Sequence, residues 1–144
     1  MPGVIQQLPT PPDCATPVRS RVHSVPHVLA VTADVAFYAA VLGVGTDARW
    51  RIDWARSLHR AVEACTVKAV PVVIYDTNLP GVDWQWAFDC FAAVAHAPRV
   101  VLAAASIDED LWCDVLDRRG YDVVERTAPP DTLRRILRFA WLSV

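Results

Sequence analysis

The feature that most constrains the fold of this chain is a short apolar run that ends on a single carboxylate. Residues 72–75 read Val-Val-Ile-Tyr, a β-branched and aromatic run typical of a strand buried on both faces. Asp76 ends the run, and Pro80 and Gly81 then stop both strand and helix, so a loop must follow. Open parallel sheets place their chemistry at the carboxyl ends of strands. Asp76 is therefore a candidate functional residue, although capping the following turn would also explain it.

Apolar strand patterns and helical patterns alternate from residue 27 onward. Short polar residues that can cap helices stand before the helical patterns. The first helix is expected over 35–42, because Gly43 and Gly45 follow it. The predicted strands are 28–31, 49–54, 70–76, 99–105 and 122–126, and the predicted helix starts are at Asp34, Ser57, Asp83, Ser106 or Asp108, and Asp131.

This alternation predicts one parallel sheet, built from right-handed βαβ units and covered by helices on both faces. The strands at 28–31, 70–76 and 99–105 are apolar throughout, as central strands are, whereas 49–54 alternates like an edge strand. We infer an α/β, flavodoxin-like, doubly wound (βα)5 sheet with strand order 2-1-3-4-5. The ends of the first and third strands are neighbours in that order, which brings Thr32, Ala33 and Asp34 close to Asp76.

Residues 1–26 differ from the rest because they are rich in proline and lack a sustained apolar period. We assign 1–26 to a flexible arm and 27–144 to a single domain, with a docking peptide as the alternative role for the arm. His23 and His27, at the end of the arm, are expected to be solvated. The sequence has no signal peptide and no apolar run long enough to span a membrane, so we expect a cytoplasmic protein.

Composition excludes several classes of function. The net charge is −2 and the acids are interspersed among the arginines, so we expect no nucleic-acid partner. The four cysteines show no metal-ligand spacing, and Cys65, Cys90 and Cys113 lie in hydrophobic segments. We predict that these three are buried thiols, and we expect no resident cofactor.

Residues 72–81 read Val-Val-Ile-Tyr-Asp-Thr-Asn-Leu-Pro-Gly, and Asp83 completes the pattern Asp-x-x-Leu-Pro-Gly-x-Asp. In this order of elements the sequence resembles the receiver domain of two-component response regulators, which have a CheY-like fold. The resemblance covers residues 28–142 and includes Gly-Tyr-Asp-Val-Val at 120–124. It implies that Asp76 is the phosphoacceptor for a histidine kinase and that the backbone carbonyl of Asn78 helps to hold Mg²⁺.

The chain departs from this family where the metal would bind. The family has two acids at the end of the first strand, and the sequence has Thr32 and Ala33 there. Only Asp34 remains nearby, and it also suits the cap of a helix. Mg²⁺ needs several hard oxygen ligands, so Asp34, Asp76 and Asn78 predict weak magnesium binding at most.

The phosphate-contacting positions of the family have changed as well. A hydroxyl residue at the end of the fourth strand is replaced by Ala104, and an aromatic switch on the fifth strand by Val123. The family's lysine and following proline are matched by Arg126 and Thr127, so Arg126 is the remaining candidate for a phosphate contact.

We therefore expect a stand-alone, atypical receiver-like domain that signals through protein–protein interaction, with weak or no phosphorylation and no enzymatic activity. An ordinary response regulator phosphorylated on Asp76 is the first alternative. A flavodoxin-like cofactor-binding protein is the second, although residues 32–35 lack the Ser/Thr/Gly-rich loop that such a site needs.

Partners implied by the resemblance are a histidine kinase, another regulator, or a second copy of the chain. Family members often pair through their fourth helix, fifth strand and fifth helix, and exposed Trp is enriched at interfaces. The helical spacing also requires Trp84 or Trp86 to be partly exposed. The interface candidates on the pairing face are Trp112, Arg119, Arg135 and Phe139.

Overall fold

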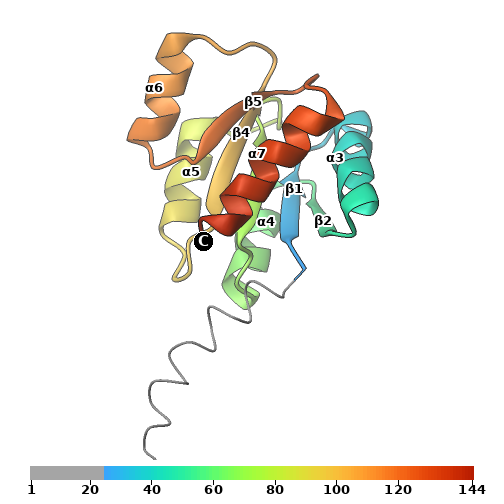
Figure 1. The fold of residues 1–144 in the computed structure, drawn as a ribbon. Coiled ribbons are helices and arrows are strands. Elements are labelled where there is room, and N and C mark those ends of the chain that lie inside the picture. Colours follow the sequence, from blue (N-terminus) through green and yellow to red (C-terminus); the bar gives the residue numbers. More distant parts are fainter. Residues whose placement is uncertain (1–24) are drawn as a thin grey trace, which may run out of the picture.

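The computed structural model describes residues 25–144, which form a five-stranded sheet with the order β2-β1-β3-β4-β5 (Figure 1). Every neighbouring pair of strands is parallel. The predicted fold class and strand order are confirmed. The arm assigned to 1–26 lies almost wholly outside the described residues. The strands are β1 (His27–Val31), β2 (Arg51–Ala55), β3 (Val72–Asp76), β4 (Arg99–Ala104) and β5 (Asp122–Glu125).

Helices cover both faces of this sheet. One face carries α3 and α7, and the other carries α4, α5 and α6, each with its own apolar core (Figure 1). The helices are α3 (Val35–Ala48), α4 (Leu58–Val67), α5 (Trp84–Ala92), α6 (Glu109–Asp117) and α7 (Pro130–Leu142).

Strand β3 lies in the middle of the molecule and is buried along its whole length. Its side chains alternate between the two layers, as in any strand. Val73 and Tyr75 enter the core under α4, α5 and α6, whereas Val72 and Ile74 enter the core under α3 and α7. The two-sided apolar run in the sequence is therefore explained by burial on both faces.

Side chains cap the N-termini of four helices as predicted. Asp34 accepts a hydrogen bond from the backbone of Ala36, and Ser57 accepts one from Arg60. Asp83 and Asp108 serve α5 and α6 in the same way. Because Asp34 begins α3 directly after β1, it lies at the carboxyl end of the sheet.

The predicted end of the first helix was wrong. Helix α3 passes through Gly43 and Gly45 and ends only at Arg49, which adopts the left-handed conformation with φ of 61°. A Cβ atom at position 45 would overlap the side chain of Ile52 in β2. Gly45 therefore permits close packing of the helix on the edge strand and does not terminate the helix.

Two further sequence predictions need correction. Cys65 is buried, but Cys90 is half-buried and Cys113 is exposed on α6. His27 is not solvated, because its Nε2 atom lies 2.7 Å from Oδ2 of Asp53 and its side chain is 14% exposed. His23 lies outside the described residues. Of the two Trp residues on α5, Trp86 is exposed, as expected.

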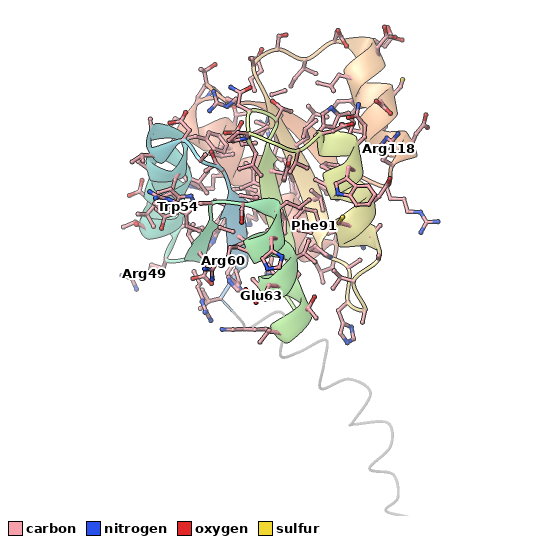
Figure 2. The ribbon with its side chains drawn as sticks, turned by 180° about the vertical axis from the view of Figure 1, so that it is seen from behind. Arg49, Trp54, Arg60, Glu63, Phe91 and Arg118 are labelled. Atoms are coloured by element: carbon pink, nitrogen blue, oxygen red, sulfur yellow. The ribbon has the colours of Figure 1, made fainter. Side chains whose placement is uncertain are left out.

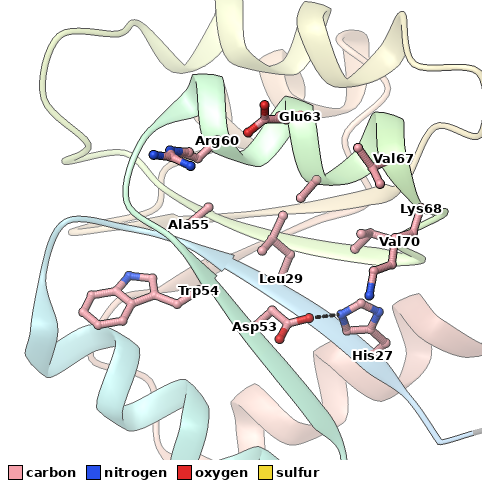
Figure 3. Close-up of a pocket in the computed structure, with 11 residues that line it drawn as sticks. His27, Leu29, Asp53, Trp54, Ala55, Arg60, Glu63, Val67, Lys68 and Val70 are labelled. Carbon is pink, nitrogen blue, oxygen red and sulfur yellow. Dashed lines mark hydrogen bonds and ion pairs between the residues drawn. The ribbon is translucent and has the colours of Figure 1, made fainter.

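The His27–Asp53 pair borders a hollow of about 460 Å³ between β2 and α4, with Leu29, Ala55 and Val70 among the apolar residues that line it (Figure 3). This hollow lies on the α4 side of the sheet edge, away from Asp76. No helix within residues 25–144 is both long and apolar enough to cross a membrane.

Candidate functional site at the carboxyl ends of the strands

Asp76 and Thr32 meet at the carboxyl ends of two adjacent strands. Val31 of β1 pairs in register with Tyr75 of β3, so the residues that follow them lie side by side. The hydroxyl of Thr32 donates a hydrogen bond of 2.6 Å to Oδ2 of Asp76. Both side chains are buried, and Asp76 is only 1% exposed. A buried carboxylate needs compensating partners, because its desolvation is costly.

The main partner of Asp76 is Arg126. Its backbone N–H bonds to the carbonyl of Ala104, which holds the residue directly beyond the end of β5. Its Nε atom donates to Oδ1 of Asp76 at 2.8 Å, and one terminal nitrogen lies 3.2 Å from Oδ2 of the same carboxylate. That terminal nitrogen also donates to Oδ2 of Asp34 at 2.7 Å. A planar guanidinium fork suits such two-point binding, whereas a lysine ammonium does not.

The carboxylate of Asp76 is fully saturated by these contacts. Its Oδ1 atom accepts from Arg126 and from the backbone N–H of Asn78 at 2.9 Å, and its Oδ2 atom accepts from Thr32 and Arg126. A carboxylate offers about four acceptor positions. No lone pair of Asp76 therefore faces solvent.

The charges in this cluster stabilise one another. Hydrogen bonding to Arg126, then to the backbone of Ala36, lowers the pKa of Asp34 below its ordinary value. Burial alone would lower the pKa of Arg126, but its hydrogen bonds to Asp76 and Asp34 outweigh that effect and raise it. The guanidinium carbon also lies 5.5 Å from the centroid of the Phe37 ring. Arg126 is thus held by side chains from two segments of the chain, the start of α3 and the end of β3.

Trp54 is a site-bordering residue that sequence reasoning missed. Its indole N–H donates to the backbone carbonyl of Thr32 at 2.8 Å. The ring of Trp54, labelled in Figure 2, stacks on Tyr38 of α3 with 4.1 Å between ring centroids. The guanidinium carbon of Arg56 lies 4.2 Å from the centroid of the Trp54 ring. The available signal was the position of Trp54 at the end of a strand predicted to neighbour the first strand.

These residues do not fit a magnesium ion. Mg²⁺ would need the oxygens of Asp34 and Asp76, and the guanidinium of Arg126 already binds both carboxylates. A second cation at the same oxygens would be repelled by Arg126 and would have to displace it. Within residues 25–144, no group of three or more His, Cys, Asp or Glu side chains could hold a metal.

The other positions at which the sequence departs from the receiver pattern supply no hydrogen bond to the carboxylate of Asp76. Ala33 and Thr127 are exposed, and Ala104 and Val123 are buried. Val123 packs in the core under α4, α5 and α6. No aromatic ring or hydroxyl stands at Ala104 or Val123 to form a switch.

The predicted interface residues are spread over both sides of the edge strand β5. Trp112 on α6 is 41% exposed and Phe139 on α7 is 55% exposed. Arg119 and Arg135 are exposed as well. Helices α6 and α7 cover opposite faces of the sheet, so these candidates come from both sides of its β5 edge.

Comparison with solved structures establishes the class of fold. The signal receiver domain of a putative Luxo repressor protein from Vibrio parahaemolyticus has a TM-score of 0.73 at 19% identity, over 83% of this chain and 95% of that one. A response regulator from Thermotoga maritima has a TM-score of 0.75 at 16% identity, over 84% and 100%. The beryllofluoride-activated NtrC4 receiver domain dimer has a TM-score of 0.75 at 15% identity, over 81% and 97%.

The chain therefore has the fold of CheY-like response regulator receiver domains. No protein-family model and no curated protein matches the sequence. The similarity extends over almost the whole length of these receiver domains, but it concerns the backbone fold at 15–19% sequence identity.

Proposed function

We propose that this chain is a receiver-like signalling domain that acts by binding another protein and does not use phosphorylation of Asp76. One observation carries the proposal: Asp76 is buried, and all four of its acceptor positions are taken, two of them by Arg126. The fold supports the signalling role, and the side chains support the loss of phosphotransfer.

Phosphoryl transfer to Asp76 would require one of its oxygens as a nucleophile. That oxygen needs a free lone pair in line with the leaving group. The oxygens of the transferred phosphoryl group need a cation that stabilises their developing charge. Arg126 is the nearest cation, but its donors are directed at Asp76 and Asp34. The same contact removes the nucleophile and the charge that would stabilise the transfer.

The alternative of an ordinary phosphoacceptor requires Arg126 to leave both carboxylates. If Arg126 left, Asp34 and Asp76 would remain close together without a positive charge between them. Thr32 and Ala33 carry no carboxylate that could help to hold a metal ion in place of Arg126. We infer that the Arg126 cluster is a fixed structural element. It holds the carboxyl ends of β1, β3 and β5 in one arrangement without a metal ion.

The direct test is phosphorylation in solution. The full chain is incubated with acetyl phosphate and Mg²⁺ and its intact mass is measured. We expect no increase of about 80 Da, which is the mass of one added phosphoryl group. A near-stoichiometric adduct that disappears in Asp76→Asn would overturn the proposal.

A restored variant provides the positive control. Ala33→Asp, Ala104→Thr and Arg126→Lys together return an acid, a hydroxyl and a lysine to the positions where receiver domains are expected to have them. We expect this triple variant to gain a phospho-adduct that Asp76→Asn removes. If it gains none while it remains folded, loss of these groups does not explain the inactivity of the native site.

A further inference from the structure

The outer face of α3 carries no charge before its last turn, where Asp47 is exposed. Residues 35–46 include no Asp, Glu, Lys or Arg, and two of their larger apolar side chains are exposed, Val35 by 60% and Leu42 by 39%. A helix on the surface of a globular protein normally presents polar residues to water. The exposed residues between Val35 and Leu42, and just beyond, are small: Ala36, Ala39, Ala40 and Gly43. This α3 face is therefore an exposed apolar surface made largely of small side chains.

Arginines border the α3 face on the β2 side. Arg49 follows the last turn of α3 (Figure 2). Arg56 lies over the ring of Trp54, which also stacks on Tyr38 of the helix. Neither Arg49 nor Arg56 forms an ion pair within the described part of the chain.

The α7 side of the α3 face carries charges of both signs, because Arg134 pairs there with the exposed Asp47 and Asp131. Arg134 on α7 lies 3.9 Å from Asp47 near the end of α3, which shows that this side of α7 faces the helix. Arg138 stands one turn further along α7, on the same side, and is exposed. It has no carboxylate partner among residues 25–144. An apolar face bordered by the unpaired Arg49, Arg56 and Arg138 favours an acidic partner with large apolar side chains.

Helix α6 of the same chain has those properties. Trp112 and Leu116 lie one turn apart and are 41% and 46% exposed. Glu109, Asp110 and Asp117 stand around them, are exposed, and form no ion pair in the part of the chain that the structure describes. The α6 face is therefore an apolar ridge among unpaired acids.

We propose that α6 of one copy of this chain packs on α3 of a second copy. The large side chains of Trp112 and Leu116 would pack over the small residues Ala39 and Gly43, and the acids of α6 would meet the unpaired arginines beside α3. Aromatic side chains and arginine are enriched at protein interfaces, and packing of ridges into grooves governs helix contacts. The inference names the partner in the proposed function, and it rests on action through protein contact but not on the state of Asp76.

The placement of the two faces decides the geometry of the assembly. Helix α3 packs beside the edge strand β2, and α6 packs beside the opposite edge strand β5, on the other face of the sheet (Figure 1). The contact therefore joins different surfaces of the two copies, head to tail, and can repeat along a chain of copies. A two-fold contact of α3 on α3 would bring arginines against arginines and is disfavoured.

The test is the oligomeric state of the full chain, measured by sedimentation velocity at low salt over a range of concentrations. We expect the sedimentation coefficient of the wild type to rise beyond that of a dimer as concentration increases. Added salt should weaken this association. Ala39→Glu blocks the α3 face with bulk and like charge, and Trp112→Ser with Leu116→Ser removes the ridge. Each of these two variants should sediment as a monomer with an unchanged circular dichroism spectrum.

Mixing the two blocked variants distinguishes this contact from other ones. Ala39→Glu retains the α6 face and the double variant retains the α3 face, so an equimolar mixture should form a one-to-one dimer that grows no further. Ala92→Glu, at an exposed alanine of α5, is the matched control and should associate like the wild type.

Three outcomes would overturn the inference. The first is a wild type that stays monomeric at every concentration. The second is an Ala39→Glu variant that still dimerises, as a contact across α6, β5 and α7 alone would allow. The third is a mixture of the two blocked variants that fails to associate. A monomeric wild type that bound anionic vesicles in an Ala39-dependent way would assign the α3 face to a lipid surface. Phosphorylation of Asp76 would contradict the proposed function and leave these results unchanged.

Discussion

Tyr75 and Asp76 are consecutive residues of β3, and both are almost fully buried. They differ in hydrogen bonding, because the polar atoms of Asp76 have partners and the hydroxyl of Tyr75 has none within the described residues. The carboxylate of Asp76 has a donor at every acceptor position. The hydroxyl of Tyr75 is buried between α4 and α5 with no partner within the described residues. Burial raises the pKa of Tyr75 to about 12, with a further contribution from the charge of Asp76.

The difference follows from the two environments. The carboxyl end of the sheet collects loops, which bring Arg126, Thr32 and backbone N–H groups to Asp76. The core under α4, α5 and α6 surrounds Tyr75 with apolar side chains, with Phe88 and Phe91 at 6.4 and 6.3 Å between ring centroids. A buried charge persists only with partners, whereas a neutral hydroxyl can remain unsatisfied at a smaller cost.

The largest effect is expected from Arg126→Ala. It leaves Asp76 buried beside Asp34 without a cation, so the free energy of unfolding should fall by about 3–5 kcal/mol. Urea unfolding at neutral pH measures the change. Arg134→Ala is the matched control, because Arg134 pairs with the exposed Asp131 and should cost less than about 1 kcal/mol. Equal losses in the two variants would show that the Asp76 cluster is not a special region of the fold.

A smaller loss is expected from Thr32→Val, which keeps the shape of the side chain and removes its hydroxyl. Oδ2 of Asp76 then loses one donor and the backbone N–H of Asp34 loses its acceptor, which should cost about 1–3 kcal/mol. Thr46→Val removes an exposed hydroxyl that bonds back to Leu42 and should change stability by less than about 0.5 kcal/mol. The same urea series compares the two, and a neutral Thr32→Val would mean that Arg126 alone satisfies Asp76.

Tyr75→Phe should have the opposite sign. Removing an unpartnered hydroxyl ends its desolvation penalty while the ring keeps its contacts, so we expect a gain of up to about 1 kcal/mol. Thermal unfolding monitored by circular dichroism would detect the raised Tm. A loss larger than about 1 kcal/mol would reveal a hidden partner, such as a buried water, and would remove the contrast with Asp76.

The last effect is absent at neutral pH and appears only at alkaline pH. Burial raises the pKa of the Cys65 thiol to about 11. The ordinary pKa of a thiol is near 9, so between pH 9 and 11 the thiol ionises in the unfolded chain and stays protonated in the folded one. The free energy of unfolding should therefore decline as pH rises from about 9 toward 11. Cys65→Ala should flatten that decline, measured by urea unfolding at several pH values under reducing conditions. Cys113→Ala, at an exposed thiol, should leave the slope unchanged.

Local chemistry in the sequence was sufficient for the frame of the molecule. The two-sided apolar run of β3, the alternation in β2 and the capping residues Asp34, Ser57, Asp83 and Asp108 predicted the element order and the sheet order. The sequence was misleading at Gly45, because a glycine that ends a helix and a glycine that admits a neighbouring strand look the same in one dimension. It was also misleading at His27, whose partner Asp53 comes from the next strand.

The sequence by itself determined that a carboxylate ends the central strand and that the acids and hydroxyl expected around it are missing. Only the tertiary structure decided what Asp76 does instead, since Arg126 and Asp34 are separated from each other by 92 positions and their common contact depends on the order of the strands. Pattern and propensity act over a few residues. An ion pair between distant loops depends on where the finished sheet brings their side chains together.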